Sequence, residues 1–124
     1  GSVTITAIDA IGNTATAAIT VPGLALTFDV AGVTQAAAGG ASLITVTANG
    51  SGVGFTSAIA NNNAVSGYTD LPTIVATGTD LTITSPATLP TAAQGDQTFT
   101  ITVTDASNTN TGTLTYLLLK AAAA

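Results

Sequence analysis

Apolar and polar residues alternate along most of this chain with a period of two. In the first alternating segment, which runs on both sides of a turn-like Ile-Gly-Asn, the apolar positions are Val3, Ile5, Ala7, Ala15, Ala17 and Ile19. Further alternating segments fall within 24–30, 44–48, 53–59, 81–83, 99–103 and 114–118. Because successive side chains of a strand point to opposite faces, this period predicts β-strands, and helical spacing is nearly absent. The sequence therefore predicts an all-β protein.

The sequence predicts three parts of the chain. Pro22-Gly23 is a strong break, and it separates a predicted N-terminal extension, residues 1–23, from the rest. Short strands with turn residues between them predict an antiparallel β-sandwich over residues 24–120. Residues 121–124 form a predicted C-terminal tail.

The connections and the core of the sandwich can also be predicted. Asn49-Gly50 is a preferred pair for a tight hairpin, 61–72 is typical of a long loop, and the prolines of 85–96 predict a crossover between sheets. The predicted core residues are Leu26, Phe28, Ile44, Val46, Phe55, Ile83, Phe99, Ile101 and Val103.

Charge is scarce in this chain of 124 residues. Only 6% of the residues are charged, the net charge is −5, and Lys120 is the single cation, whereas ordinary soluble domains carry roughly 25% charged residues. One cation cannot neutralise phosphates, so the composition excludes nucleic acid as a partner. No apolar run approaches the length of a membrane-spanning helix, which predicts no membrane insertion. A mean hydropathy of +0.56 and abundant threonine favour an extracellular, cell-surface location in which neighbours cover part of the surface.

Residues 24–119 resemble an immunoglobulin-like domain of bacterial and archaeal surface proteins. The resemblance is carried mainly by LTITSPATLPTAAQGDQTFTITVTDASNTNTGTLTYLLL, because such repeats commonly end in a strand of the FTITVTD type, a short turn and a last threonine-rich strand. It implies an immunoglobulin-like sandwich whose last two strands lie within 97–119.

The start of the chain repeats these last two strands. Residues 3–10 and 99–106 share Thr, Ile, Thr, Asp and Ala at equivalent positions, and a shift of one residue then aligns Asn13-Thr14 with Asn110-Thr111. The extension is thus a second copy of a closing strand pair that lacks the strands which should precede it. Since a lone hairpin is marginally stable at best in water, the segment needs another sheet.

Two hypotheses supply that sheet. In the first, one strand or the whole hairpin is donated to the next copy of the chain, with the six apolar side chains from Val3 to Ile19 inserted, so that a homopolymer grows through a heterologous interface. The chain would then be the structural subunit of an extracellular filament, similar to the strand-exchanging subunits of pili and archaeal threads. In the second, the chain is one repeat of a tandem adhesin or surface-layer protein, and residues 1–21 end the preceding domain.

The sequence predicts no enzyme, no catalytic residue, no metal and no cofactor. Histidine, cysteine and glutamate are absent, so only serine, threonine, aspartate and Lys120 remain. A serine–lysine or threonine–amine pair is possible in principle, but the hydroxyls are expected only to solvate the strand faces. Asp9 and Asp105 occupy equivalent strand ends, where either a bound ion or a hydrogen bond within the turn is expected, and the turn is favoured because no acidic cluster surrounds them.

Two segments are candidate carbohydrate sites. Asn49-Gly50-Ser51 matches the N-glycosylation pattern, although a turn explains Asn49-Gly50 equally well. The candidate ligand loop combines amide side chains with an aromatic ring, which can bind a sugar by hydrogen bonds and stacking, and the alternative is an inert loop. Its residues are Asn61, Asn62, Asn63 and Tyr68.

Overall fold

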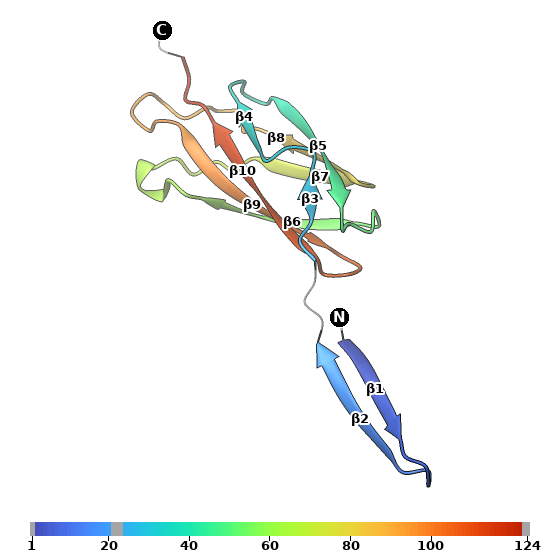
Figure 1. Ribbon diagram of the computed structural model, residues 1–124. Helices are drawn as coiled ribbons and strands as arrows, with labels where there is room; N and C mark the ends of the chain where they lie inside the picture. The colour runs from blue at the N-terminus through green and yellow to red at the C-terminus, as the bar shows by residue number, and fades with distance from the viewer. Residues whose placement is uncertain (1, 21–23, 123–124) are drawn as a thin grey trace.

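The computed structural model describes residues 2–20 and 24–122, so the predicted boundary at Pro22-Gly23 and the last two residues of the predicted tail lie outside the described residues. Within the described part the chain forms a two-stranded hairpin and two four-stranded sheets, with no α-helix (Figure 1). The hairpin consists of β1 (Ser2–Ile8) and β2 (Thr14–Thr20), which pair antiparallel.

The two larger sheets form the sandwich. The first has the strand order β4–β10–β9–β6, and the second has the order β3–β5–β8–β7. The strands of the first sheet are β4 (Gly32–Gln35), β6 (Phe55–Asn61), β9 (Gln97–Asp105) and β10 (Thr111–Leu118). Those of the second are β3 (Thr27–Phe28), β5 (Ala41–Ala48), β7 (Thr73–Thr77) and β8 (Asp80–Thr84). A short 3₁₀ turn, η1 (Ala64–Ser66), follows β6.

This strand order confirms the predicted all-β sandwich. Apart from β4, which pairs parallel with β10, the sheets are antiparallel. The order is compatible with an immunoglobulin-like domain, in which the first, second, fifth and fourth strands form one sheet and the third, sixth and seventh form the other. The segment 85–96 connects β8 of one sheet to β9 of the other, as its prolines predict.

The predicted core is confirmed. Seven of the nine predicted side chains are buried between the sheets, and Phe28 and Phe55 pack against them partly buried. Tyr68, Leu81, Leu114, Tyr116 and Leu118 complete the buried apolar cluster. Phe99 and Tyr116 lie on neighbouring strands with their ring centroids 6.2 Å apart in an edge-to-face arrangement, which is a favourable geometry for aromatic rings.

One predicted turn is wrong, and two strands were not predicted from the period-two pattern. Asn49-Gly50 does not close a hairpin, because β5 before it and β6 after it belong to different sheets. Asn49 has φ = 64°, so the left-handed conformation that Asn-Gly favours is used in a connection between sheets. Strands β4 and β7 were not predicted, because each is a short edge strand with only one or two side chains facing the core.

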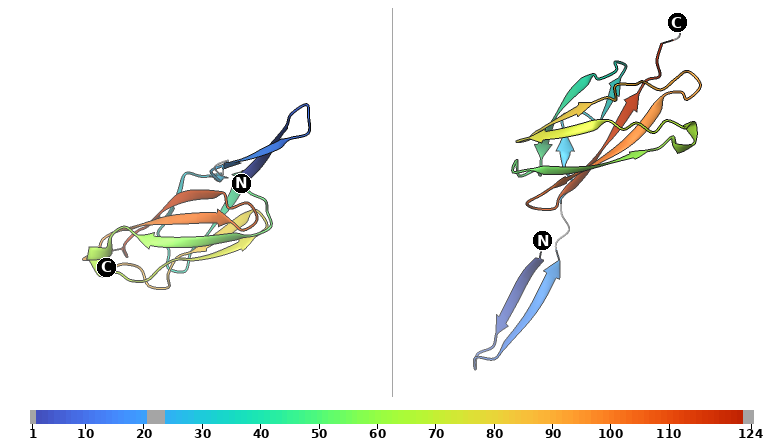
Figure 2. Two further views of the ribbon diagram at one scale, coloured as in Figure 1. Left: turned by 90° about the horizontal axis from the view of Figure 1, so that it is seen from below. Right: turned by 180° about the vertical axis from the view of Figure 1, so that it is seen from behind.

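The chain enters and leaves the sandwich at opposite ends. The backbone amide of Leu26 donates to the carbonyl of Thr111, which begins β10, at 2.8 Å. The chain continues past Leu118, at the other end of the same strand. At about 3.3 Å per residue the two points are roughly 23 Å apart, and Figure 2 shows the same arrangement from two further sides.

Candidate functional site

The candidate site is the apolar face of the hairpin β1–β2. The six predicted donor side chains share this face, because Val3 lies opposite Ile19, Ile5 opposite Ala17 and Ala7 opposite Ala15. Every residue from 2 to 20 is exposed, and among the described residues no strand of the sandwich pairs with the hairpin. Side chains of this face stay half exposed, with Val3 at 52%, Ile5 at 51% and Ile19 at 48%. A sheet face of this kind normally lies against another sheet.

The hairpin repeats the register of β9–β10 as well as its sequence. Every residue pair of the hairpin, from Ser2 opposite Thr20 to Ile8 opposite Thr14, has a counterpart, from Thr98 opposite Leu117 to Thr104 opposite Thr111. The single extra residue of the second pair lies in its turn. Register is fixed by turn geometry and by the face that is buried, so the two hairpins are built to present the same face.

The counterparts of the six exposed side chains are all buried. They are Phe99, Ile101, Val103, Gly112, Leu114 and Tyr116, and they face the second sheet of the sandwich. The strand pair β9–β10 therefore shows how a hairpin of this register is covered when its partner sheet is present.

The hairpin does not fit the place that β9–β10 occupy in this sandwich. Ala15 corresponds to Gly112, where an added Cβ would lie 2.6 Å from the carbonyl oxygen of Leu26. Ala17 corresponds to the buried Leu114, and a loss of this size costs about 2–5 kcal/mol. The hairpin thus shares the register of β9–β10 but not the side chains that fit the sheet opposite them.

The turn of β9–β10 is hydrogen-bonded to the connection between β5 and β6. The carboxylate of Asp105, which is fully buried, accepts hydrogen bonds from the backbone amide of Ser51 and from its hydroxyl, the latter at 2.8 Å. The side-chain amide of Asn110 donates to the carbonyl of Asn49 at 2.8 Å. The Ser51 amide above all holds the pKa of Asp105 well below its usual range, although burial acts in the opposite direction.

The turn of the hairpin has the corresponding aspartate and asparagine, and among the described residues no second segment binds it. The amide of Asp9 donates to the carbonyl of Asn13 at 2.9 Å, as Asp105 does to Asn110 at 2.8 Å. The Asp9 carboxylate then accepts from the backbone amide and the side-chain amide of Asn13, both at 2.9 Å. These bonds, the Asn13 backbone amide first, hold the pKa of Asp9 below its usual range. The predicted turn role of both aspartates agrees with these contacts, and Asp105 has in addition a role across the sandwich that the sequence did not indicate.

The side chains of Asn49 and Ser51 in the glycosylation pattern both make hydrogen bonds within the fold. The side-chain amide of Asn49 donates to the carbonyl of Ala25 at 2.7 Å, and the hydroxyl of Ser51 donates to Asp105. Asn49 itself is exposed. Glycosylation at this position stays a prediction.

The candidate ligand loop is held together by its own amides. Asn61 donates to the carbonyl of Tyr68 at 3.2 Å, Asn62 donates to the Thr100 hydroxyl at 2.9 Å, and the side-chain oxygen of Asn63 accepts from the Thr98 amide at 2.7 Å. Tyr68 is only 6% exposed, so its ring packs in the core and does not lie open for stacking. The structure brings these four residues together as a structural connection.

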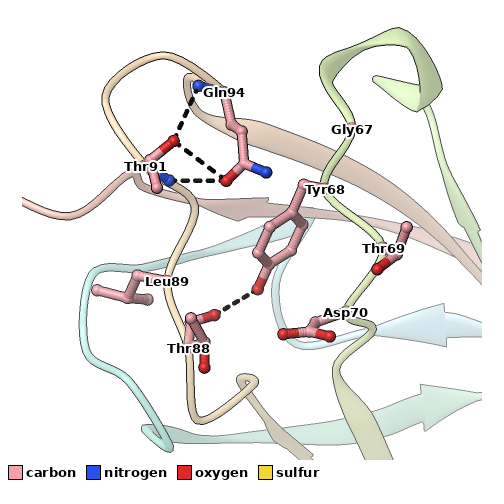
Figure 3. Close-up of a pocket in the computed structure, with 8 residues that line it drawn as sticks. All are labelled: Gly67, Tyr68, Thr69, Asp70, Thr88, Leu89, Thr91 and Gln94. Carbon is pink, nitrogen blue, oxygen red and sulfur yellow. Dashed lines mark hydrogen bonds between the residues drawn. The ribbon is translucent and has the colours of Figure 1, made fainter.

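A cavity of about 290 Å³ adjoins this loop. Figure 3 shows the Tyr68 hydroxyl donating to the Thr88 carbonyl, at 2.6 Å, and Gln94 bonded to Thr91 on the opposite wall. Burial, and to a lesser degree the charge of Asp70, raises the pKa of Tyr68. Tyr68, Thr91 and Gln94 are thus bonded to other residues that line the cavity, and its volume lies at the lower limit for small-molecule sites.

Within the described residues no group of three acidic, histidine or cysteine side chains could hold a metal ion, and no helix is long and apolar enough to cross a membrane. The sequence matches no protein-family model, no curated protein and no solved structure. The assignment of a function therefore rests on the geometry of the hairpin and the sandwich.

Proposed function

We propose that this chain is a structural module that joins β-sandwiches end to end, and that the hairpin β1–β2 supplies the two closing strands of a neighbouring sandwich. The observation that carries the proposal is the register that β1–β2 share with β9–β10, together with an apolar face that is exposed in one pair and buried in the other. A two-stranded hairpin with such a face gains stability only when a second sheet covers it.

The path of the chain favours a linear arrangement. Because the chain enters this sandwich near Thr111 and leaves it beyond Leu118, successive sandwiches would follow one another along a line. A module of this kind spaces or extends a larger structure and needs no catalytic site. The few charges and the many threonines of the chain support a place in an extracellular rod or surface layer, of the immunoglobulin-like kind that the sequence resembles.

The neighbouring sandwich is, on this proposal, a related sandwich in a tandem array. A second copy of this chain already has β9–β10 in the closing position, and the contact at Gly112 and the missing volume at Ala17 make the hairpin a poor replacement there. A different repeat, with larger side chains opposite Ala17 and more room opposite Ala15, would accept it.

Strand exchange between copies is the second candidate, and one observation favours it. Strand β6 lies at the edge of its sheet and is seven residues long. Each strand of the hairpin has the same length. An unpaired edge of matching length can accept a further strand from another copy. The filament hypothesis then requires docking beside β6, with β9–β10 remaining in place.

Sedimentation velocity of the intact chain separates the two candidates. The array proposal predicts that the chain is a monomer at micromolar concentration. It also predicts that Ile5→Asp leaves the sedimentation coefficient unchanged, as does the matched control Thr6→Asp on the opposite face of the same strand. Large assemblies that Ile5→Asp abolishes and Thr6→Asp preserves would contradict the array and favour strand exchange.

The claim that the hairpin is a closing strand pair is tested by transplanting it. In the full chain, residues 98–117 are replaced by a second copy of residues 2–20 that carries the side chains this core requires. The five substitutions in the transplant are Val3→Phe, Ala7→Val, Ala15→Gly, Ala17→Leu and Ile19→Tyr. We expect cooperative urea unfolding of the sandwich, and we expect a much lower midpoint when Thr4→Ile and Ile5→Thr are added, because they move the central isoleucine to the outer face and place a threonine in the core. A transplant that does not fold would refute the proposal.

A further inference from the structure

We infer that the neighbouring sandwich binds the hairpin turn through a polar loop that donates a hydroxyl and a backbone amide to the carboxylate of Asp9. This inference rests on the proposed function and identifies the specificity-determining contact of the same surface. The partner segment is a serine- or threonine-containing connection between the strands of that sandwich that correspond to β5 and β6, in the position that residues 49–51 occupy here.

The first step of the argument is the equivalence of the two turns. Asp9 follows β1 directly and Asp105 is the last residue of β9, at equivalent places of the shared register, and each donates its backbone amide to the carbonyl of the asparagine that ends the turn. The backbone of Asp9 is therefore placed as that of Asp105 is. What differs is the set of partners that their side chains find.

The second step compares the hydrogen bonds of the two turns. In the sandwich, Ser51 donates twice to Asp105, and Asn110 donates to the Asn49 carbonyl. In the hairpin these interactions have no counterpart, and the side-chain amide of Asn13 donates to Asp9 instead. A docked loop would take over the carboxylate, and Asn13 would be free to donate to a carbonyl of that loop, as Asn110 does.

The third step concerns specificity. Apolar side chains define which face is buried, but the alternation alone tolerates many partners. The Asp9 carboxylate already accepts from the backbone amides of Ile11 and Asn13 and from the Asn13 side chain. Its burial costs least where the neighbour replaces the lost water with further donors, as Ser51 does for Asp105 in addition to the amide of Ser107. A neighbour with a short hydroxyl-bearing loop is thus preferred over one that offers no donor at this point.

A double-mutant cycle in the transplanted chain tests the contact, because the Asp9 of the transplanted copy takes the place of Asp105 opposite Ser51. Asp9 in this cycle means the residue of that copy. We expect Asp9→Asn and Ser51→Ala each to lower the equilibrium constant for folding, by about tenfold for the loss of a hydrogen bond to a charged group. The two losses should not add fully, because each removes the charged hydrogen bond between the Ser51 hydroxyl and the carboxylate, whereas the backbone amide of residue 51 is present in every variant. The reference cycle is Asp105→Asn with Ser51→Ala in the unaltered chain, where the same coupling is expected. Asp9→Asn in the unaltered chain should leave the unfolding of the sandwich unchanged.

The outcomes separate this inference from the proposed function. A transplant that folds with additive effects of Asp9→Asn and Ser51→Ala would overturn the inference and leave the closing role of the hairpin intact. A transplant that does not fold would overturn both.

Discussion

Gly112→Ala tests the steric argument that keeps the hairpin out of this sandwich. The added Cβ would lie 2.6 Å from the backbone oxygen of Leu26 and 2.8 Å from its Cβ. Leu26 cannot easily retreat, because it is buried and its amide is bonded to Thr111 at 2.8 Å. Overpacking of this kind lowers the free energy of unfolding by about 1–3 kcal/mol. Alanine also reduces the conformational entropy of the unfolded chain, which raises the free energy of unfolding by about 0.4–1 kcal/mol. The central values of the two ranges give a net loss of about 1.3 kcal/mol.

Urea unfolding followed by far-ultraviolet circular dichroism measures this loss as a lower midpoint with an unchanged slope. Gly54→Ala is the matched control, since its Cβ would meet only the Ala106 Cβ at 3.9 Å, and it should be neutral or slightly stabilising. Ala15→Gly in the hairpin should leave the midpoint unchanged. A Gly112→Ala variant as stable as the parent would refute the steric reasoning and reopen the closing position to a second copy.

Three further predictions concern the sandwich. Leu114→Ala should cost about 2–5 kcal/mol in the same urea assay, whereas Ala17→Leu in the hairpin should cost nothing. Tyr68→Phe should cost about 0.5–1.5 kcal/mol because the hydrogen bond to the Thr88 carbonyl is lost, and an unaffected midpoint would show that this bond does not hold the loop. The depressed pKa of Asp105 stabilises the fold above its unfolded-state pKa of about 3.9, so stability should decline as the pH falls below about 5. Asp105→Asn should flatten that decline, and an unchanged slope would show that another carboxylate causes it.

The sequence predicted those parts of the fold in which alternation and burial coincide. Long central strands such as β9 and β10 have one buried face and one threonine face, so their period of two is unbroken. The edge strand β7 was missed because Val75 is exposed and its apolar run does not alternate. The burial of Tyr68 was not predicted, because nothing local indicates that an irregular segment folds back over the core.

The candidate site could be predicted only in part. The repeat of residues 3–10 at 99–106 showed that the hairpin copies a closing strand pair, and the alternation identified its apolar face. The misfit at Gly112 could not be predicted, because it depends on the backbone of Leu26, which is distant in sequence. The contact between Asp105 and Ser51 joins residues far apart in the chain, and no pattern along the sequence indicates it.

Amide hydrogen exchange of the transplanted chain tests the central claim most directly, because one molecule then carries the same turn and outer face twice. We predict rapid exchange throughout the N-terminal copy and, in the transplanted copy, slow exchange at the positions where β9 and β10 are protected in the parent chain. Equally rapid exchange in both copies would contradict the claim that β1–β2 is a closing strand pair whose sandwich is supplied by a neighbour.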